Sequence, residues 1–471
     1  MAKLTTDIIL LTRGAAGYVA ALSLVNEVPH LAAKIRIVDL MVAPSSAWFN
    51  LCSSAFGFHQ SLGVAEQEFI VATGARIKYG TRVEMLGKVA GFFSDAAFGA
   101  PLEGLSFFQL FTKYVQQNPA ATLRDYCLVA QLAAAGKCRI RTRQPDPLDD
   151  LINCGYVVGD QAYTDFLRAL CKQKNIAFFA VKNIEADVAG DTIQALTCDG
   201  TRLLGDLYVD CSEGSGLAAA LGLATREIFH SAAPLRVVTT YDVNPSAKLE
   251  NFGAFVGLAP EGLRYEWLVG SGIGQTYCLE KPSYGGAPAE QGEVAGFAAL
   301  DSAWVGNCVF LGAASATLPG FIVDDLHRVR SGILRLVNCW PSCDNLNVLA
   351  KIFNRRTQEE LMPLAAIDDY VLHCAFGAAV PLLPLVEHKL ALFHAVGRVP
   401  MHEAETLTSD NWQVLFHAFG ERVAGSDLLT QAMSDESLAE KFPSMVRFFA
   451  SVTAKSPSVS DCYSAVPKRN G

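Results

Sequence analysis

The first forty residues have a spacing that suits the binding of a phosphate-bearing cofactor. Residues 7–11 (DIILL) form an apolar run of strand length, and Gly14, Ala15 and Gly17 follow in a small-residue turn. Asp39 closes a second strand-like run about 20 residues later, which is the layout of a dinucleotide-binding βαβ unit. Glycines let the backbone approach a pyrophosphate, the helix N-terminus supplies partial positive charge, and the acid accepts hydrogen bonds from a ribose. The spacing predicts a dinucleotide site at these residues.

Thr12 stands where this fingerprint usually has its first glycine. That glycine normally makes the tight turn, and a G-x-x-G alone is a weak motif, so phosphate binding does not follow from the turn by itself. The other interpretation is a βαβ unit whose small residues only let a helix and a strand pack closely. Both interpretations remain open at this point.

The composition of the 471-residue chain is that of a large folded protein. Hydrophobic residues make up 51% and charged residues 18%, which supports a large buried core and argues against extensive disorder. The formal net charge is −9 and no segment is rich in lysine and arginine, so nucleic acid is not expected as a partner. The length allows about two to four domains.

The cysteines and the N-terminus favour a reduced, cytoplasmic protein. The 13 cysteines are dispersed without a CxxC pair, and Cys339 and Cys343 have no histidine beside them, so no metal site is expected. Scattered cysteines in an odd number fit buried, reduced thiols. The N-terminus lacks the basic segment and apolar core of a signal peptide, and no uncharged apolar run is long enough to span a membrane.

Three separated segments share the strand–turn pattern of a nucleotide site. Besides the N-terminal unit, residues 206–212 (DLYVDCS) run into a turn at Ser212, and residues 304–311 (WVGNCVFL) run into a turn at Gly312. A nucleotide domain interrupted by a sheet, as in many flavin-dependent oxygenases, would bring such turns together. Helices are predicted at 323–337 and 348–361. The predicted divisions are a nucleotide-binding core at 1–230, a substrate-domain sheet at 231–300, a return to the core at 301–345 and a helical region at 346–471.

Several blocks along the chain resemble, in the same order, blocks of the flavin-dependent tryptophan halogenase family. The most specific are residues 62–69 (LGVAEQEF), 74–80 (GARIKYG), 156–168, 199–212, 304–309 (WVGNCV), 353–356 (FNRR) and 370–373 (YVLH). The resemblance is distant and extends from residue 7 to residue 449. It implies an α/β, Rossmann-like FAD-binding fold with an inserted substrate sheet and a helical C-terminal region.

The resemblance also implies a chemistry. Family members use reduced FAD from a separate flavin reductase, with oxygen and halide, to form hypohalous acid that acts near a lysine beside an aromatic substrate. Lys78 falls on that lysine, and its alternative is a strand lysine whose ammonium reaches solvent. The other implied positions are Gly14, Ala15, Gly17, Asp39, Ser212 and Gly312 for the cofactor, and Tyr265 and Trp267 for the substrate.

The sequence departs from the family at positions that its chemistry uses. Residues 48–53 (WFNLCS) align with the family's GEATIP loop and keep nothing of it, and residues 263–268 keep little of its tryptophan-rich WxWxIP motif. Ile322 stands at the position of the catalytic glutamate. Asp324 and Asp325 either replace that acid after a shift or form the acidic first turn of a helix. Glu213 brings a carboxylate into the second turn, where it would repel pyrophosphate, so weak FAD binding is expected.

Two functions follow from this mixture of kept and lost positions. The first is a halogenase-like flavin oxidoreductase or monooxygenase acting on a tryptophan-like or larger aromatic substrate, with a homodimer as one possible assembly. Lys78 and Asp39 favour it. The second is a catalytically inactive binding or accessory protein with the halogenase fold. The residues at Thr12, Phe49, Glu213 and Ile322 favour this second function.

Overall fold

The structure is a computed structural model of the chain. It describes residues 7–41, 48–85, 88–142, 144, 146–212, 214–227, 235–243, 253–259, 262–269, 273–280, 293–295, 298–340, 346–377, 380–425 and 427–465. Of the strands between residues 235 and 295 it describes the backbone path only.

Contacts within the chain divide it into two compact units, and the chain passes between them several times. Unit 1 contains Met1–Gly63, Val158–His230 and Gly296–Asp368. Unit 2 contains Val64–Val157, Ser231–Ala295 and Asp369–Gly471. Each unit has a main sheet and helices of its own.

Unit 1 is built on a six-stranded sheet with the order β20-β21-β12-β1-β2-β8. Neighbouring strands are parallel except for β20 and β21, which pair antiparallel. The middle strand β1 is buried along its whole length, because both faces of a parallel sheet are covered by other layers. The strands are β1 (Ile8–Thr12), β2 (Ile35–Leu40), β8 (Ala177–Val181), β12 (Leu207–Asp210), β20 (Trp304–Val305) and β21 (Cys308–Phe310).

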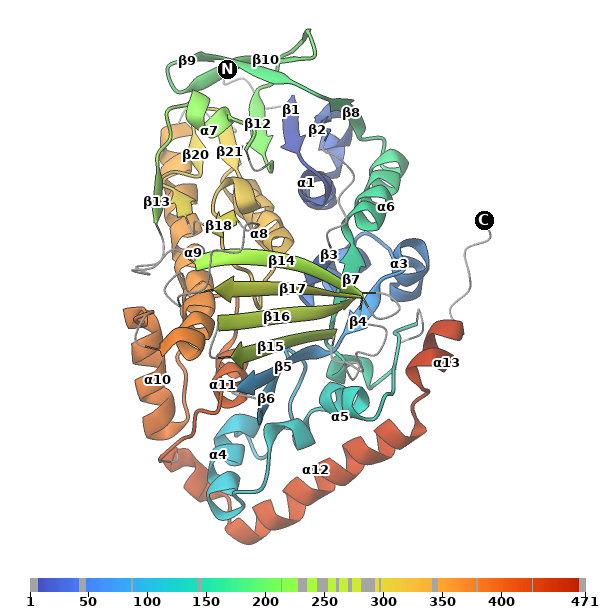
Figure 1. Ribbon diagram of the computed structural model, residues 1–471, viewed down its shortest axis with the longest axis vertical. Helices are drawn as coiled ribbons and strands as arrows, with labels where there is room; N and C mark the ends of the chain where they lie inside the picture. Colours follow the sequence, from blue (N-terminus) through green and yellow to red (C-terminus); the bar gives the residue numbers. More distant parts are fainter. Residues whose placement is uncertain are drawn as a thin grey trace. The chain divides into compact units, whose positions relative to one another are not determined.

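Helices cover one face of this sheet and a small antiparallel sheet covers the other. Helix α1 packs against β1, α6 and α8, and Figure 1 shows α1 and α6 alongside β1 and β2. The second layer is the sheet β11-β10-β9, which shares a buried apolar cluster with Ile9, Leu11 and Val38 of the central strands. The bounds are α1 (Ala15–Glu27), α6 (Asp160–Gln173), α8 (Asp325–Asn338), β9 (Ile184–Ala189), β10 (Thr192–Cys198) and β11 (Thr201–Leu203). Shorter elements are β3 (Trp48–Leu51), α2 (Ser54–Ser61), α7 (Leu217–Ala220), β13 (Thr225–Glu227) and β19 (Ala298–Leu300).

Unit 2 contains a seven-stranded sheet with the order β18-β14-β17-β16-β15-β5-β6. All neighbours are antiparallel except β15 and β5, which are parallel. The strands are β5 (Gly80–Met85), β6 (Lys88–Phe93), β14 (Leu235–Val243), β15 (Gly253–Ala259), β16 (Gly262–Val269), β17 (Ile273–Glu280) and β18 (Glu293–Ala295). The short strand β4 (Arg76–Lys78) directly precedes β5 and pairs antiparallel with β7 (Gly155–Gly159).

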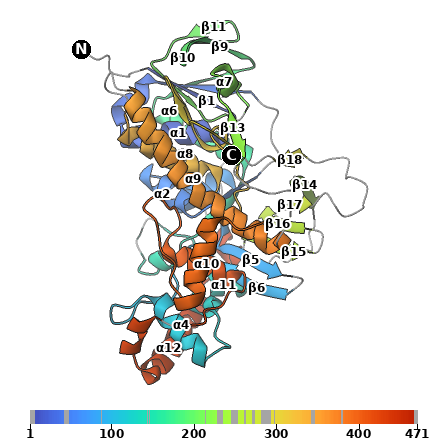
Figure 2. The same cartoon turned by 90° about the vertical axis from the view of Figure 1, so that its left-hand side faces the viewer.

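The helices of unit 2 pack against the β5–β6 end of this sheet and against one another. A Cβ atom on Gly91 of β6 would lie 2.5 Å from the Cα atom of Ala418, so α11 rests directly on the strand, as Figure 2 shows. Helix α12 contacts α4 and α5. The bounds are α3 (Glu66–Thr73), α4 (Phe107–Gln117), α5 (Leu128–Ala134), α10 (Pro384–Val396), α11 (Ser409–Ala418), α12 (Asp435–Lys455) and α13 (Val459–Ser464); α9 (Leu346–Phe376) begins in unit 1 and ends in unit 2.

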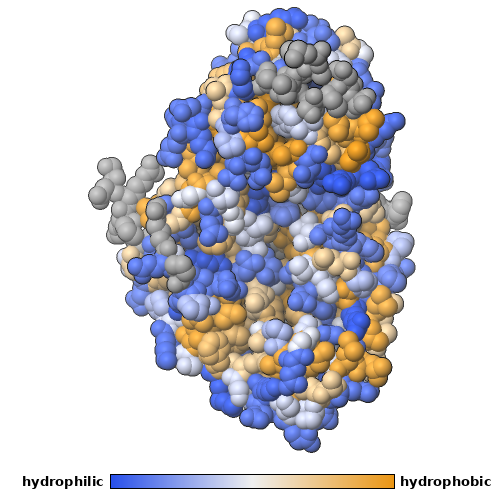
Figure 3. All heavy atoms as spheres, turned by 180° about the vertical axis from the view of Figure 1, so that it is seen from behind, coloured by the Kyte–Doolittle hydropathy of each residue, from blue (hydrophilic) through white to orange (hydrophobic). Residues whose placement is uncertain are grey.

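The predicted α/β class, with a second sheet and a helical C-terminal region, is confirmed. Among the described residues no helix is long and apolar enough to cross a membrane, and no three side chains of the His, Cys, Asp or Glu type gather where they could hold a metal ion. Every cysteine whose side chain the structure describes carries a free thiol. On the face shown in Figure 3, hydrophobic residues lie in groups between hydrophilic ones, as on most folded proteins.

Candidate functional site

The N-terminal turn is held together by the threonine that replaces the expected glycine. Gly14 has a φ of 76°, a conformation that favours glycine. The Thr12 hydroxyl donates a hydrogen bond to the Gly14 carbonyl oxygen and accepts one from the Gly17 N–H group, both 2.8 Å long. A Cβ atom on Gly17 would lie 2.4 Å from the Thr12 Cβ atom. The turn is therefore tight despite the missing first glycine, and Gly17 is required for the close approach of α1 to β1.

Helix α1 presents an open N-terminus beside this turn. The helix begins at Ala15, and no side chain caps it within the described part of the chain. Its first N–H groups and its dipole concentrate partial positive charge at this end. Arg13 and Gly14 line a pocket at the same place. This is the arrangement in which a helix start binds a phosphate.

Asp39 is fixed at the end of β2 by two partners. The Tyr18 hydroxyl donates to Asp39 Oδ2 over 2.7 Å, and the Arg168 guanidinium forms an ion pair with the same oxygen. Arg168 Nε also donates to the Tyr18 hydroxyl over 3.0 Å. Burial and the hydrogen bond to Asp39 raise the pKa of Tyr18, so the phenol keeps its proton. Asp39 is 5% exposed.

The pocket at this edge of the sheet has a volume of about 770 Å³. Its polar side chains carry both signs of charge, and aromatic rings of β8 complete the lining. The lining residues include Arg13, Gly14, Asp39, Asp160, Asp165, Arg168, Lys172, Phe178 and Phe179. A phosphate next to Gly14, a ribose hydroxyl on Asp39 and a flat ring near the phenylalanines would each find a suitable partner. The pocket therefore fits the nucleotide part of a dinucleotide such as FAD.

The other two predicted turns lie at the ends of neighbouring strands in the same sheet. Leu11 of β1 is level with Asp210 of β12, which is level with Phe310 of β21. Ser212 donates its hydroxyl to Asp210 Oδ1 over 2.6 Å, and its N–H group donates to the same oxygen over 2.8 Å. Burial raises the pKa of Asp210. Ser212 thus shapes the turn through Asp210, and Glu213 lies outside the described residues.

Gly312 is required for the packing of α8 against the sheet. Its φ is 58°, and a Cβ atom there would lie 2.6 Å from Val329 Cγ2. The Arg328 guanidinium donates to the Gly312 carbonyl oxygen over 3.4 Å and to the Ala316 carbonyl oxygen over 2.8 Å. The structure thus brings Gly14, Ala15, Gly17, Asp39, Ser212 and Gly312 to one edge of one sheet, the edge where α/β folds bind ligands.

Lys78 lies in unit 2 at the end of β4, opposite Gly155 of β7. It is only 7% exposed, which argues against the alternative of a strand lysine whose ammonium reaches solvent. Tyr265 and Trp267 lie on β16, where Val256 and Ala254 of β15 are their register partners. The side chains of Tyr265 and Trp267 lie outside the described part of the structure. Strand β15 separates β16 from β5, the strand that continues from Lys78.

The sequence model of the tryptophan halogenase family matches residues 7–232 and 296–435. The chain belongs to the tryptophan halogenase family. This confirms the resemblance seen in the sequence blocks, and no curated protein sequence matches the chain.

Solved structures agree with the family assignment at the level of the fold. A flavin-dependent halogenase from Brevundimonas sp. BAL3 is 21% identical, with a TM-score of 0.83 over 98% of this chain and 99% of that chain. A flavin-dependent halogenase from Xanthomonas campestris is 21% identical, with a TM-score of 0.82 over 99% of both chains. A tryptophan 6-halogenase from Streptomyces toxytricini is 15% identical, with a TM-score of 0.81 over 99% of this chain and 100% of that chain.

The two acids beside Ile322 have structural roles in this halogenase-family protein. Asp324 caps α8 by accepting from the His327 N–H group over 3.0 Å, and its other oxygen accepts from the Cys52 N–H group over 2.7 Å. Asp325 pairs with Arg328. The interpretation of these acids as a helix start is therefore confirmed. Ile322 itself is buried.

A buried carboxylate that the sequence reasoning missed lies against the same segment. Asp368 accepts hydrogen bonds from the N–H groups of Gly320 and Phe321, over 3.0 and 3.1 Å. It is 3% exposed, and burial raises its pKa to about 7. The sequence signal for it was an aspartate inside an apolar helical stretch of α9. Nothing local in the sequence connects it with residues 320–321, because 47 positions separate Asp368 from Phe321.

Proposed function

We propose that the protein is a flavin-dependent halogenase-like oxidoreductase that acts on an aromatic group. The observation that carries the proposal is the family match over residues 7–232 and 296–435, the two segments on either side of the inserted sheet. The tight Thr12–Gly17 turn and the buried Lys78 agree with it. The fold alone would not support a proposal of flavin-dependent chemistry. Family membership together with a cleft that fits a nucleotide does support it.

FAD fits the cleft of unit 1. When bound in its reduced form, FAD would supply the oxidation of halide by oxygen. The open start of α1 and Arg13 would hold the pyrophosphate, and Asp39 would accept a ribose hydroxyl. Arg168 and Tyr18 keep Asp39 in place for that contact. The reduced flavin would come from a separate reductase, and binding is expected to be weak.

Lys78 is the proposed catalytic residue. Its Nζ atom would donate a hydrogen bond to hypohalous acid or carry the halogen as an amine, and so direct it to the substrate. Tyr265 and Trp267 are proposed to hold a flat aromatic substrate by stacking. The Streptomyces toxytricini relative is named for tryptophan, and we propose tryptophan or a larger molecule with a similar ring here. A cytoplasmic location and a homodimer are part of the same proposal.

One observation favours a second function, a binding or accessory protein without catalysis. Ile322 occupies the position of the family's glutamate, and Asp324 and Asp325 are committed to α8. A chain without the acid would still bind nucleotide while losing turnover.

Titration with FAD followed by product analysis separates these functions. The purified chain is titrated with oxidised and reduced FAD, then supplied with a flavin reductase, oxygen, bromide and tryptophan or indole. The halogenase proposal predicts a brominated product that Lys78→Met abolishes and Lys455→Met, a change of an exposed lysine on α12, does not. FAD binding without any product supports the accessory function. Absence of FAD binding would contradict both the halogenase proposal and the accessory function, because both assume that the cleft of unit 1 binds FAD.

A further inference from the structure

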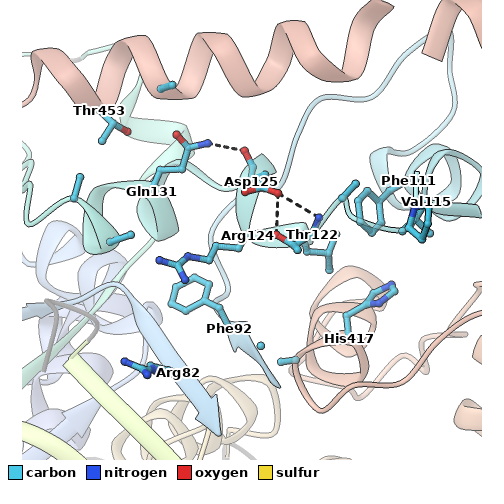
Figure 4. Close-up of a pocket in the computed structure, with 18 of the residues that line it drawn as sticks. Arg82, Phe92, Phe111, Val115, Thr122, Arg124, Asp125, Gln131, His417 and Thr453 are labelled. Atoms are coloured by element: carbon cyan, nitrogen blue, oxygen red, sulfur yellow. Dashed lines mark hydrogen bonds between the residues drawn. The ribbon is translucent and has the colours of Figure 1, made fainter. Parts of the chain in front are cut away.

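Unit 2 contains a second pocket that none of the proposed halogenase residues lines. Its volume is about 860 Å³, within the range of small-molecule sites. Lys78 is not part of its wall. The wall is formed by β5 and β6, the segment from α4 to α5, the end of α11 and the C-terminal half of α12. Figure 4 shows side chains from these elements around one space.

One part of the pocket wall is made of aromatic and other apolar side chains. Phe92, Phe111 and the His417 ring contribute aromatic surface, and Phe111 and His417 meet edge to face with centroids 5.8 Å apart. Alanines at the end of α5 and on α12 also line the pocket: Ala134, Ala135, Ala450 and Ala454. Small side chains at these positions leave room for a flat, ring-shaped body between the helices.

The polar part of the wall carries an excess of positive charge. Arg82, Arg124 and Arg422 line the pocket, and Asp125 is its acidic residue. Asp125 accepts from the Thr122 hydroxyl over 2.9 Å, and Arg82 pairs with Glu84. The three guanidinium groups on the wall thus stand against one carboxylate on the wall, Asp125, and one beside it, Glu84, in a chain whose net charge is −9. A single added negative charge would balance this wall.

A buried hydroxyl in the pocket lacks a partner. Thr453 of α12 is 7% exposed, and its Oγ1 atom has no hydrogen-bond partner in the described part of the chain. Buried polar atoms are normally satisfied, so an open one on a pocket wall marks a place where a ligand would bind. In Figure 4 this hydroxyl is turned toward the other lining side chains.

His417 adds a neutral ring rather than a charge. Burial and the neighbouring Arg422 lower the pKa of His417 to about 4, so the ring is neutral at pH 7. The positive charge of the pocket therefore comes from its arginines. The guanidinium fork matches a carboxylate in geometry.

We propose that this pocket binds an aromatic carboxylate, with the ring between the alanine-lined helices and Phe92 and the carboxylate near Arg124. A monoanion is favoured over a phosphate dianion because the wall has an excess of one positive charge. The Thr453 hydroxyl would bind a polar atom of the ligand. The proposal is independent of halogenation and of FAD binding.

The test compares 2-naphthoate with its neutral analogue 2-naphthamide by calorimetric titration of the full chain. The naphthoate should bind about tenfold more tightly than the amide, because a charge-assisted contact to arginine is lost in the amide. Arg124→Gln should remove this difference, and Arg447→Gln, which changes an exposed arginine of α12, should preserve it. Equal binding of the two compounds to the unchanged chain would overturn the proposal.

Two further variants place the ligand inside the pocket. Ala454→Phe fills the space from an exposed helix position and should abolish binding of both compounds without preventing folding. Thr453→Val should lower naphthoate affinity several-fold while leaving the melting temperature equal or higher, since it removes an unsatisfied hydroxyl. FAD should not compete with naphthoate in either case. Unchanged binding to Ala454→Phe, or competition by FAD, would show that the ligand binds elsewhere.

Discussion

The two pockets of the molecule are close in size and opposite in construction. The cleft of unit 1 has about 770 Å³ and the arginine pocket of unit 2 about 860 Å³. The first is built from strand ends, a glycine turn and a helix start, with acids and bases mixed around it. The second is built from side chains of distant helices, with apolar walls and an excess of arginine. The volume of a pocket therefore does not indicate which class of ligand it binds. The backbone N–H groups and the charged side chains that line the pocket do indicate it.

The largest expected effect concerns Asp368, a buried carboxylate of unit 1 that does not line the arginine pocket. Burial raises the pKa of Asp368 to about 7. Below its unfolded pKa the group contributes its full stability, and this contribution is lost as pH rises through about 7. We expect a loss on the order of 4 kcal/mol between pH 4 and pH 8. Asp368→Asn should flatten the pH dependence of urea unfolding; an unchanged slope would contradict the assignment. Naphthoate affinity should stay constant between pH 6 and pH 8.

A glycine pair tests the close packing on which only the cleft depends. Gly17→Ala forces a Cβ atom against Thr12 and should lower the free energy of unfolding by about 1–3 kcal/mol and weaken FAD binding. In the control Gly57→Ala, in α2 of the same unit, the added Cβ atom meets no atom within 4 Å. This variant should raise the free energy of unfolding by about 0.5–1 kcal/mol. Denaturant unfolding of both variants is the measurement. Naphthoate binding should survive in each, and equal stabilities would refute the packing argument.

Charge removal in the cleft should affect one ligand only. Asp39→Asn weakens the Arg168 pair and the proposed ribose contact, so FAD affinity should fall about tenfold, or about 1.4 kcal/mol. Asp187→Asn breaks an exposed ion pair with Arg202 and serves as the matched control, with almost no effect. Fluorescence titration with FAD measures both. A fall in naphthoate affinity in Asp39→Asn would mean that the two pockets are not independent.

The smallest expected effect concerns the threonine of the turn. Thr12→Val leaves the Gly17 N–H group without its acceptor and should cost about 1 kcal/mol of stability. Thr12→Ser keeps the hydroxyl and should cost less. Thermal unfolding of the two variants gives the comparison. If valine and serine behave alike, the hydroxyl does not hold the turn.

Much of unit 1 was predictable because its information is local. One βαβ unit contains the apolar run before Gly14, the small-residue turn and the acid at Asp39. Each of these features predicts a structural element from a pattern of a few neighbouring residues. The predicted strand 206–210 is confirmed by β12. The predicted end of a helix at residue 361 is wrong, since α9 continues to Phe376 with Pro363 inside it. Tertiary packing of a buried helix outweighed the local breaker.

The sequence by itself determined the α/β class, the place of the nucleotide turn and the family, because periodicity and turn residues are read over a few positions. Only the tertiary structure decided what individual side chains do. It placed the Thr12 hydroxyl across the turn, Asp368 against residues 320–321, and three arginines from separate elements around one pocket. Such contacts join residues tens to hundreds of positions apart. Their geometry depends on how whole layers pack, which no local pattern records.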